Sequence, residues 1–304
     1  MTSRKLWALI PLMFVLAACG RLSDDGGSTG GGGGTGGTGS TGIEHPTGAD
    51  EVVLRVEYAG GFVPVDYTLR TIPSWTLYGD GTLVMQGPQI EIYPPPALPG
   101  LTATPISEDG VQAILEAARD AGLMDGDASY GNDCIADAAT TVFTTNANGS
   151  TSVVSAYALD VGEPAGSCGN EQEADERAAL AEFQAALGDL SSWLPEGSVG
   201  QEQPLDPSEL RVYTQPYQGR PEPPQDEVAW PLGVPLDSFG DRVPDYGAPM
   251  RCGVVAGDDL STLLPVAGAA NEITPWTSDG GQYQLIFRPL LPDESGCVVA
   301  AATG

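Results

Sequence analysis

Hydrophobic and polar residues alternate over Glu51–Tyr58, which predicts a half-buried β-strand. Two further short apolar runs, Trp75–Tyr78 and Thr82–Met85, lie on either side of Gly79-Asp80-Gly81. Glycine and aspartate between two apolar runs are typical of a tight hairpin turn, because they adopt the backbone angles that such turns need. The pattern therefore predicts an antiparallel hairpin early in the folded part of the chain.

A helical pattern follows each of two predicted hairpins. The first helix is expected to begin after Ser107, whose side chain suits the N-cap position, and to end at Gly122. The second hairpin is two strand patterns joined by Asn148-Gly149, and the second helix covers about residues 171–190. The order hairpin, helix, hairpin, helix predicts an α+β domain over residues 49–197, with an antiparallel sheet and both helices on one face.

The remaining chain predicts a smaller α+β unit. Residues 198–228 are rich in proline, glutamine and glutamate and are expected to be a connector, with one strand candidate at Leu210–Thr214. Residues 229–304 then show a strand, a short helix that Pro265 should kink or end, and another strand. This strand-helix-strand unit is expected to be linked by a disulfide, and the pattern leaves open whether it shares a sheet with the first domain.

The N-terminal segment has the features of an exported protein. Residues 1–18 combine a basic start with a short apolar stretch, as signal peptides do, and the stretch is too short to span a bilayer. Leu16-Ala17-Ala18-Cys19 resembles the lipobox of bacterial lipoproteins. The resemblance implies that Cys19 is the lipidated (palmitate-bearing) first residue of an extracytoplasmic protein anchored to the cell membrane. An ordinary signal peptide with a cysteine near its cleavage site is the alternative.

Residues 19–48 are rich in glycine, serine and threonine, which predicts a flexible tether with a reach of roughly 30 Å. The glycine run lacks the Gly-Lys-Ser/Thr ending of a phosphate-binding loop. His45, near the end of the tether, is expected to be exposed to solvent and inert.

Three motifs of the first domain resemble a small bacterial α+β domain family of unknown function. They are Leu77-Tyr78-Gly79-Asp80-Gly81-Thr82, the helix start at Ile106-Ser107, and Asp137-Ala138-Ala139-Thr140-Thr141. Members of that family carry a "DGT" hairpin, a helix and a "TDAPT" entry to a second hairpin, whereas Ala139 replaces the usual proline here. The resemblance covers residues 50–190, supports the order of elements and implies no activity.

The charge of the chain excludes several functions. It has 41 acidic and 12 basic residues, a formal charge of −29, with Lys5 its only lysine and His45 its only histidine. Nucleic-acid binding and electrostatic adsorption to anionic membranes need clustered basic residues, so neither is expected. The folded part lacks the histidine or lysine that most nucleophilic and Schiff-base mechanisms use, and no cofactor is predicted.

Five cysteines are present, and export makes disulfides permissible. Cys134 and Cys168 lie beyond the open end of the second hairpin, where the chain ends converge, so we expect a Cys134–Cys168 disulfide. Cys252–Cys297 then follows by elimination once Cys19 is set aside. A cysteine metal or redox site is disfavoured because no Cys-x-x-Cys spacing occurs.

Asp125, Asp127 and Asp133 form a weak candidate for a calcium loop. Tyr130 and Ala136 stand where an EF-hand needs glycine and glutamate, so a solvated turn is the favoured alternative. The four tryptophans of the folded part are expected to pack in the core rather than line a groove: Trp75, Trp193, Trp230 and Trp276.

These observations favour a lipid-anchored cell-envelope protein that acts as a non-enzymatic binding module for an envelope protein or glycan. One alternative is a carboxylate-dependent hydrolase of wall polysaccharide, which predicts a cleft with two facing acids about 5–9.5 Å apart. The other is a solute-binding lipoprotein.

Overall fold

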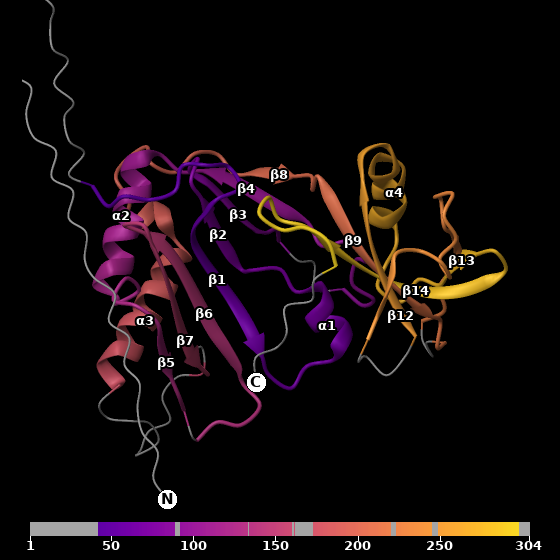
Figure 1. The fold of residues 1–304 in the computed structure, drawn as a ribbon, viewed down its shortest axis with the longest axis horizontal. Helices are drawn as coiled ribbons and strands as arrows, with labels where there is room; N and C mark the ends of the chain where they lie inside the picture. Colours follow the sequence, from indigo (N-terminus) through magenta and orange to yellow (C-terminus); the bar gives the residue numbers. More distant parts are fainter. Residues whose placement is uncertain are drawn as a thin grey trace, which may run out of the picture. The chain divides into compact units, whose positions relative to one another are not determined.

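A computed structural model describes residues 42–88, 92–132, 134–159, 161, 173–219, 223–244 and 249–297. The predicted signal peptide, Cys19, most of the tether, Asp133 and Cys168 lie outside these residues. Residues 42–304 belong to one compact unit, and its described part contains two β-sheets (Figure 1). The chain is therefore α+β and rich in antiparallel pairing, as predicted.

The first sheet has eight strands in the order β5-β7-β6-β1-β2-β3-β4-β8. All its neighbours are antiparallel except β5 and β7. Its strands are β1 (Val52–Gly60), β2 (Trp75–Tyr78), β3 (Thr82–Gln86), β4 (Leu101–Pro105), β5 (Ala128–Tyr130), β6 (Ala139–Ala147), β7 (Ser150–Tyr157) and β8 (Gln203–Leu205).

Both predicted hairpins are present in this sheet. β2 and β3 are joined through Gly81, whose φ of 84° and close approach to the Ile106 carbonyl oxygen leave no room for a side chain. β6 and β7 are joined by Asn148 and Gly149, with φ of 52° and 72°. Positive φ at both central residues matches the right-handed twist of the strands, so local turn chemistry sets the register here.

Two helices, α2 (Glu108–Asp120) and α3 (Ala174–Leu187), lie side by side against one face of the first sheet (Figure 1). The Ser107 hydroxyl oxygen accepts a hydrogen bond from the Gly110 amide and caps α2. A short 3-10 helix, η1 (Leu190–Ser192), follows α3. The core between helices and sheet contains apolar side chains from every layer, including Leu54, Leu77, Ile114, Phe143, Leu180 and Phe183.

The last residues of the predicted tether are part of this body. The His45 side chain is only 6% exposed, and its ring lies within hydrogen-bond distance of Glu108 and of the Pro46 carbonyl. Ile43 exchanges hydrogen bonds with the Gln112 side chain. The expectation of an exposed His45 was therefore wrong, because the apolar Ile43 packs on the core and brings the following residues onto α2.

The second sheet has six strands in the order β10-β13-β14-β9-β12-β11. Its strands are β9 (Glu209–Pro216), β10 (Val228–Ala229), β11 (Asp241–Val243), β12 (Met250–Ala256), β13 (Trp276–Ser278) and β14 (Gly281–Pro289). The strand expected at Leu210–Thr214 is thus β9, a central strand with both faces buried rather than a surface crossing. The proline and glutamine residues around this strand led us to expect a connector, so the central position of the strand was not predicted.

One face of the second sheet is covered by α4 (Gly257–Ala269). α4 continues beyond Pro265 to Ala269, so the proline does not end it. Leu263 and Ala267, on either side of Pro265, are fully buried and hold the helix on the sheet. The strand-helix-strand unit predicted from the sequence is β12, α4 and β14, completed by β9 between the two strands.

Segments that follow the strands of each sheet pack against the other sheet. The short helix α1 (Val65–Arg70), which follows β1, places Leu69 against Tyr213 and Ile286 on the second sheet. In the other direction, residues 290–297 return from β14, and Leu291 packs with Tyr78 and other residues of the first sheet. Each sheet therefore contributes a segment that covers part of the other.

Candidate functional site

A pocket of about 210 Å³ lies at one end of the second sheet, on the face that α4 covers elsewhere. Pairing of β11, β12 and β9 places Arg242 opposite Arg251 and Arg251 opposite Thr214, so these three side chains form a row across the sheet. Tyr283 of β14 stands opposite Pro216 in the next row. The lining residues are Thr214, Gln215, Pro216, Leu236, Asp237, Arg242, Pro249, Met250, Arg251 and Tyr283.

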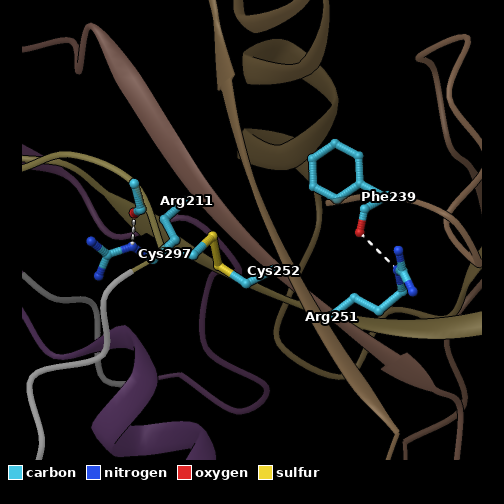
Figure 2. Close-up of a disulfide and its surroundings, with 6 residues drawn as sticks. Arg211, Phe239, Arg251, Cys252 and Cys297 are labelled. Carbon is cyan, nitrogen blue, oxygen red and sulfur yellow. Dashed lines mark hydrogen bonds between the residues drawn. A yellow bond between two sulfur atoms is a disulfide. The ribbon is translucent and has the colours of Figure 1, made fainter. Parts of the chain in front are cut away.

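Arg251 is held in place by backbone carbonyls. Its Nε donates to the carbonyl of Phe239 over 3.1 Å, as Figure 2 shows, and its Nη2 donates to those of Ser238 and Gly240. The loop can approach β12 this closely because residue 240 is glycine. Gly240 has a φ of 63°, and a side chain there would collide with the Cys252 carbonyl. The loop before β11 therefore acts as a clamp that fixes a cation in the pocket wall.

Three other polar groups of the lining have no partner in the described part of the chain. Arg242, an exposed residue of β11, makes no hydrogen bond or ion pair with it, and neither does the Tyr283 hydroxyl. The Thr214 hydroxyl is buried and also unpaired. A buried hydroxyl without a partner costs about 1–3 kcal/mol, so the floor of this pocket is not optimised for stability.

The pocket is also unusual in its charge. Among the described lining residues, two arginines against one aspartate give an excess of one positive charge, in a chain whose formal charge is −29. Its volume is below the roughly 300–1,000 Å³ of sites for drug-sized ligands. The arrangement is therefore suited to a small ligand, or to one end of a larger one.

A second group of charged residues joins the sheets. Asp293 Oδ1 accepts hydrogen bonds of 2.6 Å from Arg55 Nη2 and from the Tyr78 hydroxyl. Burial alone would raise the pKa of Asp293, but these two donors outweigh it and lower that pKa below its ordinary value. Burial and the bond to Asp293 raise the pKa of Tyr78, so Tyr78 is a neutral donor.

Two further carboxylates lie near this group. Arg288 of β14 forms a two-pronged ion pair with Glu294, over 2.6 and 2.7 Å. Glu57 of β1 has a pKa raised chiefly by burial, against the attraction of Arg55. Apart from Glu57, these side chains bind one another across the two sheets, so we assign the cluster to holding residues 290–297 in place.

The predicted disulfide Cys252–Cys297 is confirmed (Figure 2). It joins β12 to the end of the described C-terminal segment, and Arg211 Nε donates to the adjacent Gly296 carbonyl over 2.7 Å. Cys134 is also disulfide-bonded, while its predicted partner Cys168 is outside the described residues. The Cys134–Cys168 pairing stays a prediction.

The structure does not assemble the other sequence candidates into a site. Asp127 accepts a hydrogen bond from the Val153 amide, and Asp133 lies outside the described residues. Within the described ranges no three histidine, cysteine, aspartate or glutamate side chains are grouped to hold a metal. As far as the structure describes it, the pocket lining has a single carboxylate rather than the two facing acids that a glycosidase needs.

The tryptophans pack as expected. Trp75, Trp230 and Trp276 are buried, and Trp230 and Trp276 meet edge-to-face. Trp193 is partly buried against the first core and donates its indole N–H to the Ala186 carbonyl. None of the four lines the pocket.

Sequence reasoning missed the pocket because its lining comes from four strands and a loop that only the sheet pairing brings together. One weak signal was available: Arg242 and Arg251 lie nine residues apart in a chain with few cations. No helix in the described portion is both long and apolar enough to cross a membrane. The chain matches no protein-family model, no curated protein and no solved structure.

Proposed function

We propose that this protein is a lipid-anchored, extracytoplasmic binding module of the cell envelope that engages its partner through the pocket of the second sheet. The observation that carries the binding role is the pocket itself, with a clamped Arg251 and an unpaired Arg242. Hydrogen-bond donors that have no partner within the protein are typical of binding sites, where a ligand supplies the acceptors.

The anchored location rests on the sequence. Cys19 follows a signal-peptide pattern, and the glycine-rich residues 20–42 precede a body that begins at Ile43. Multiple acyl chains on one residue anchor stably, whereas a single chain binds marginally. The disulfide Cys252–Cys297 fits an oxidising, extracytoplasmic compartment.

Metabolic labelling with radioactive palmitate tests the anchor. We expect label in the wild type and none in Cys19→Ala. Equal labelling of both chains, or none in the wild type, would contradict the proposed anchor.

A photo-crosslinking amino acid placed in the envelope-localised protein tests the binding role. Val234 is the position of choice, because it is half exposed on the loop that supplies Leu236 and Asp237 to the pocket. Thr151, exposed on the far β6–β7 hairpin, is the matched control. We expect a discrete adduct from position 234 alone; equal yields from both positions, or none from either, would refute binding at this pocket.

The hydrolase alternative is less well supported, because the pocket lacks a second acid. It predicts release of reducing ends from purified wall polysaccharide, and no release would remove it.

A further inference from the structure

Hydrogen-bond donors without partners converge on the pocket of the second sheet. Arg251 uses its Nε and Nη2 to bind the loop carbonyls, while its Nη1 makes no hydrogen bond in the described structure. The Arg242 guanidinium, also in the lining, has no partner there either. A ligand that completes this site must therefore supply acceptors.

The two arginines are direct cross-strand neighbours, Arg242 on β11 and Arg251 on β12. Side chains in such a pair begin only about 4.5–5.5 Å apart, and like charges placed this way repel each other. Arg251 cannot move away, because three carbonyls fix it. An anion between the two guanidinium groups would remove the repulsion. It would also accept hydrogen bonds from N–H groups that make none within the described chain.

The remaining lining limits the charge and shape of that anion. Asp237, the only acidic residue among the described lining residues, is exposed and leaves them an excess of one positive charge, which matches a monoanion better than a dianion. Apolar residues complete the lining: Pro216, Leu236, Pro249 and Met250, of which Met250 turns its side chain to the other face of the sheet, against Leu69. The site thus combines charged and apolar lining residues within about 210 Å³.

We propose that the pocket binds a carboxylate carrying a small apolar group, with the carboxylate oxygens at Arg242 and Arg251. This assignment rests on the binding role proposed above and names the chemical class of its ligand. Guanidinium groups present paired N–H donors that match the two oxygens of a carboxylate. The ligand is either a free small acid or the carboxylate end of a larger envelope molecule.

Phenylacetate and phenylacetamide are the probes, because they share an apolar group and differ in charge. Each is titrated into the full chain in detergent, with NMR signals of the arginine Nε groups and of the Thr214 and Met250 amides as readout. Arg242→Gln is the test variant. Arg119→Gln is the control, because Arg119 is an exposed arginine of α2, outside the second sheet, paired only with its neighbour Asp120.

We expect phenylacetate to shift the pocket signals saturably and to bind about tenfold or more tightly than phenylacetamide. Arg242→Gln should weaken phenylacetate binding by a similar factor without lowering the melting temperature, since Arg242 has no partner in the described fold and faces the like charge of Arg251. Arg119→Gln should bind as the wild type does. The same titration with a peptide that ends in phenylalanine distinguishes a chain terminus from a free acid.

Equal affinity for the two probes at the pocket, unchanged in Arg242→Gln, would overturn the carboxylate assignment and leave the proposed binding role intact. Pocket signals that respond to neither probe would overturn the assignment as well. In that case the photo-crosslink from position 234 decides whether the binding role also fails.

Discussion

The contact between Asp293 and the first sheet can be tested by Asp293→Ala. Asp293 lies in the C-terminal segment and binds both Arg55 of β1 and Tyr78 of β2. The side chains of Arg55 and Asp293 are only 15% and 21% exposed. Truncation therefore leaves a largely buried guanidinium without its carboxylate and a phenol without its acceptor.

Removing one partner of a buried ion pair costs about 3–5 kcal/mol. We expect the lower end, about 3 kcal/mol, because both side chains keep some contact with water. The Tyr78 hydroxyl belongs to the same network, so its loss is included in this figure rather than added to it. Urea unfolding followed by tryptophan fluorescence measures the change in the free energy of unfolding.

The effect should depend on pH. The pKa of Asp293 is lowered in the folded protein from an ordinary 3.8, so between the two values the unfolded chain binds more protons. The stabilisation by Asp293 is therefore complete above about pH 4 to 5 and is lost as the pH falls through the folded pKa. The wild type and Asp293→Ala should converge in stability at the acid end.

An exposed pair provides the control. Asp120 Oδ1 lies 3.1 Å from Arg119 Nη2, and the side chains of Asp120 and Arg119 are 74% and 52% exposed. Asp120→Ala should therefore lower the free energy of unfolding by less than about 1 kcal/mol. The double variant Arg55→Met/Asp293→Ala should regain part of the loss, because it removes the unpaired charge. If Asp293→Ala costs no more than Asp120→Ala, the cluster does not hold the C-terminal segment as we describe.

Three further outcomes follow from the structure. Thr214→Val should raise stability by about 1 kcal/mol in urea unfolding, because it replaces a buried unpaired hydroxyl; a clear loss would show that the hydroxyl has a partner. Glu57→Gln should raise the urea midpoint at pH 7 and have no effect below pH 4.5. Burial raises the pKa of Glu57, and the cost of burying its charge disappears once the carboxylate is protonated. A stabilisation that is independent of pH would contradict this cause. The free energy of unfolding of the double variant Cys252→Ser/Cys297→Ser should fall by about 4 kcal/mol, from the chain-entropy model for cysteines 45 residues apart. A reductant should destabilise the wild type more than it destabilises this variant.

Features governed by neighbouring residues were predictable from the sequence. The Asn148-Gly149 turn, the Ser107 cap and the helix end at Gly122 act within a few residues, and the structure has each as expected. Cys252–Cys297 followed from counting the available cysteines.

Features that depend on distant pairing were not predictable. β9 is buried on both faces, so it lacks the alternation that marks a half-exposed strand, and only its pairing with β12 and β14 makes it central. The His45 side chain is buried because it lies against Glu108 of α2, which is 63 residues further along the chain. The pocket requires Thr214, Arg242, Arg251 and Tyr283 to meet, and no local signal connects them.

The central claim is that the pocket of the second sheet holds a ligand in the cell envelope. Native mass spectrometry of the full chain, isolated from its own envelope, tests this claim most directly when wild type and Arg242→Gln are compared. We predict a non-covalent mass increment on the wild type that is lost or strongly reduced in Arg242→Gln. The same increment on both chains, or none on the wild type, would contradict the account.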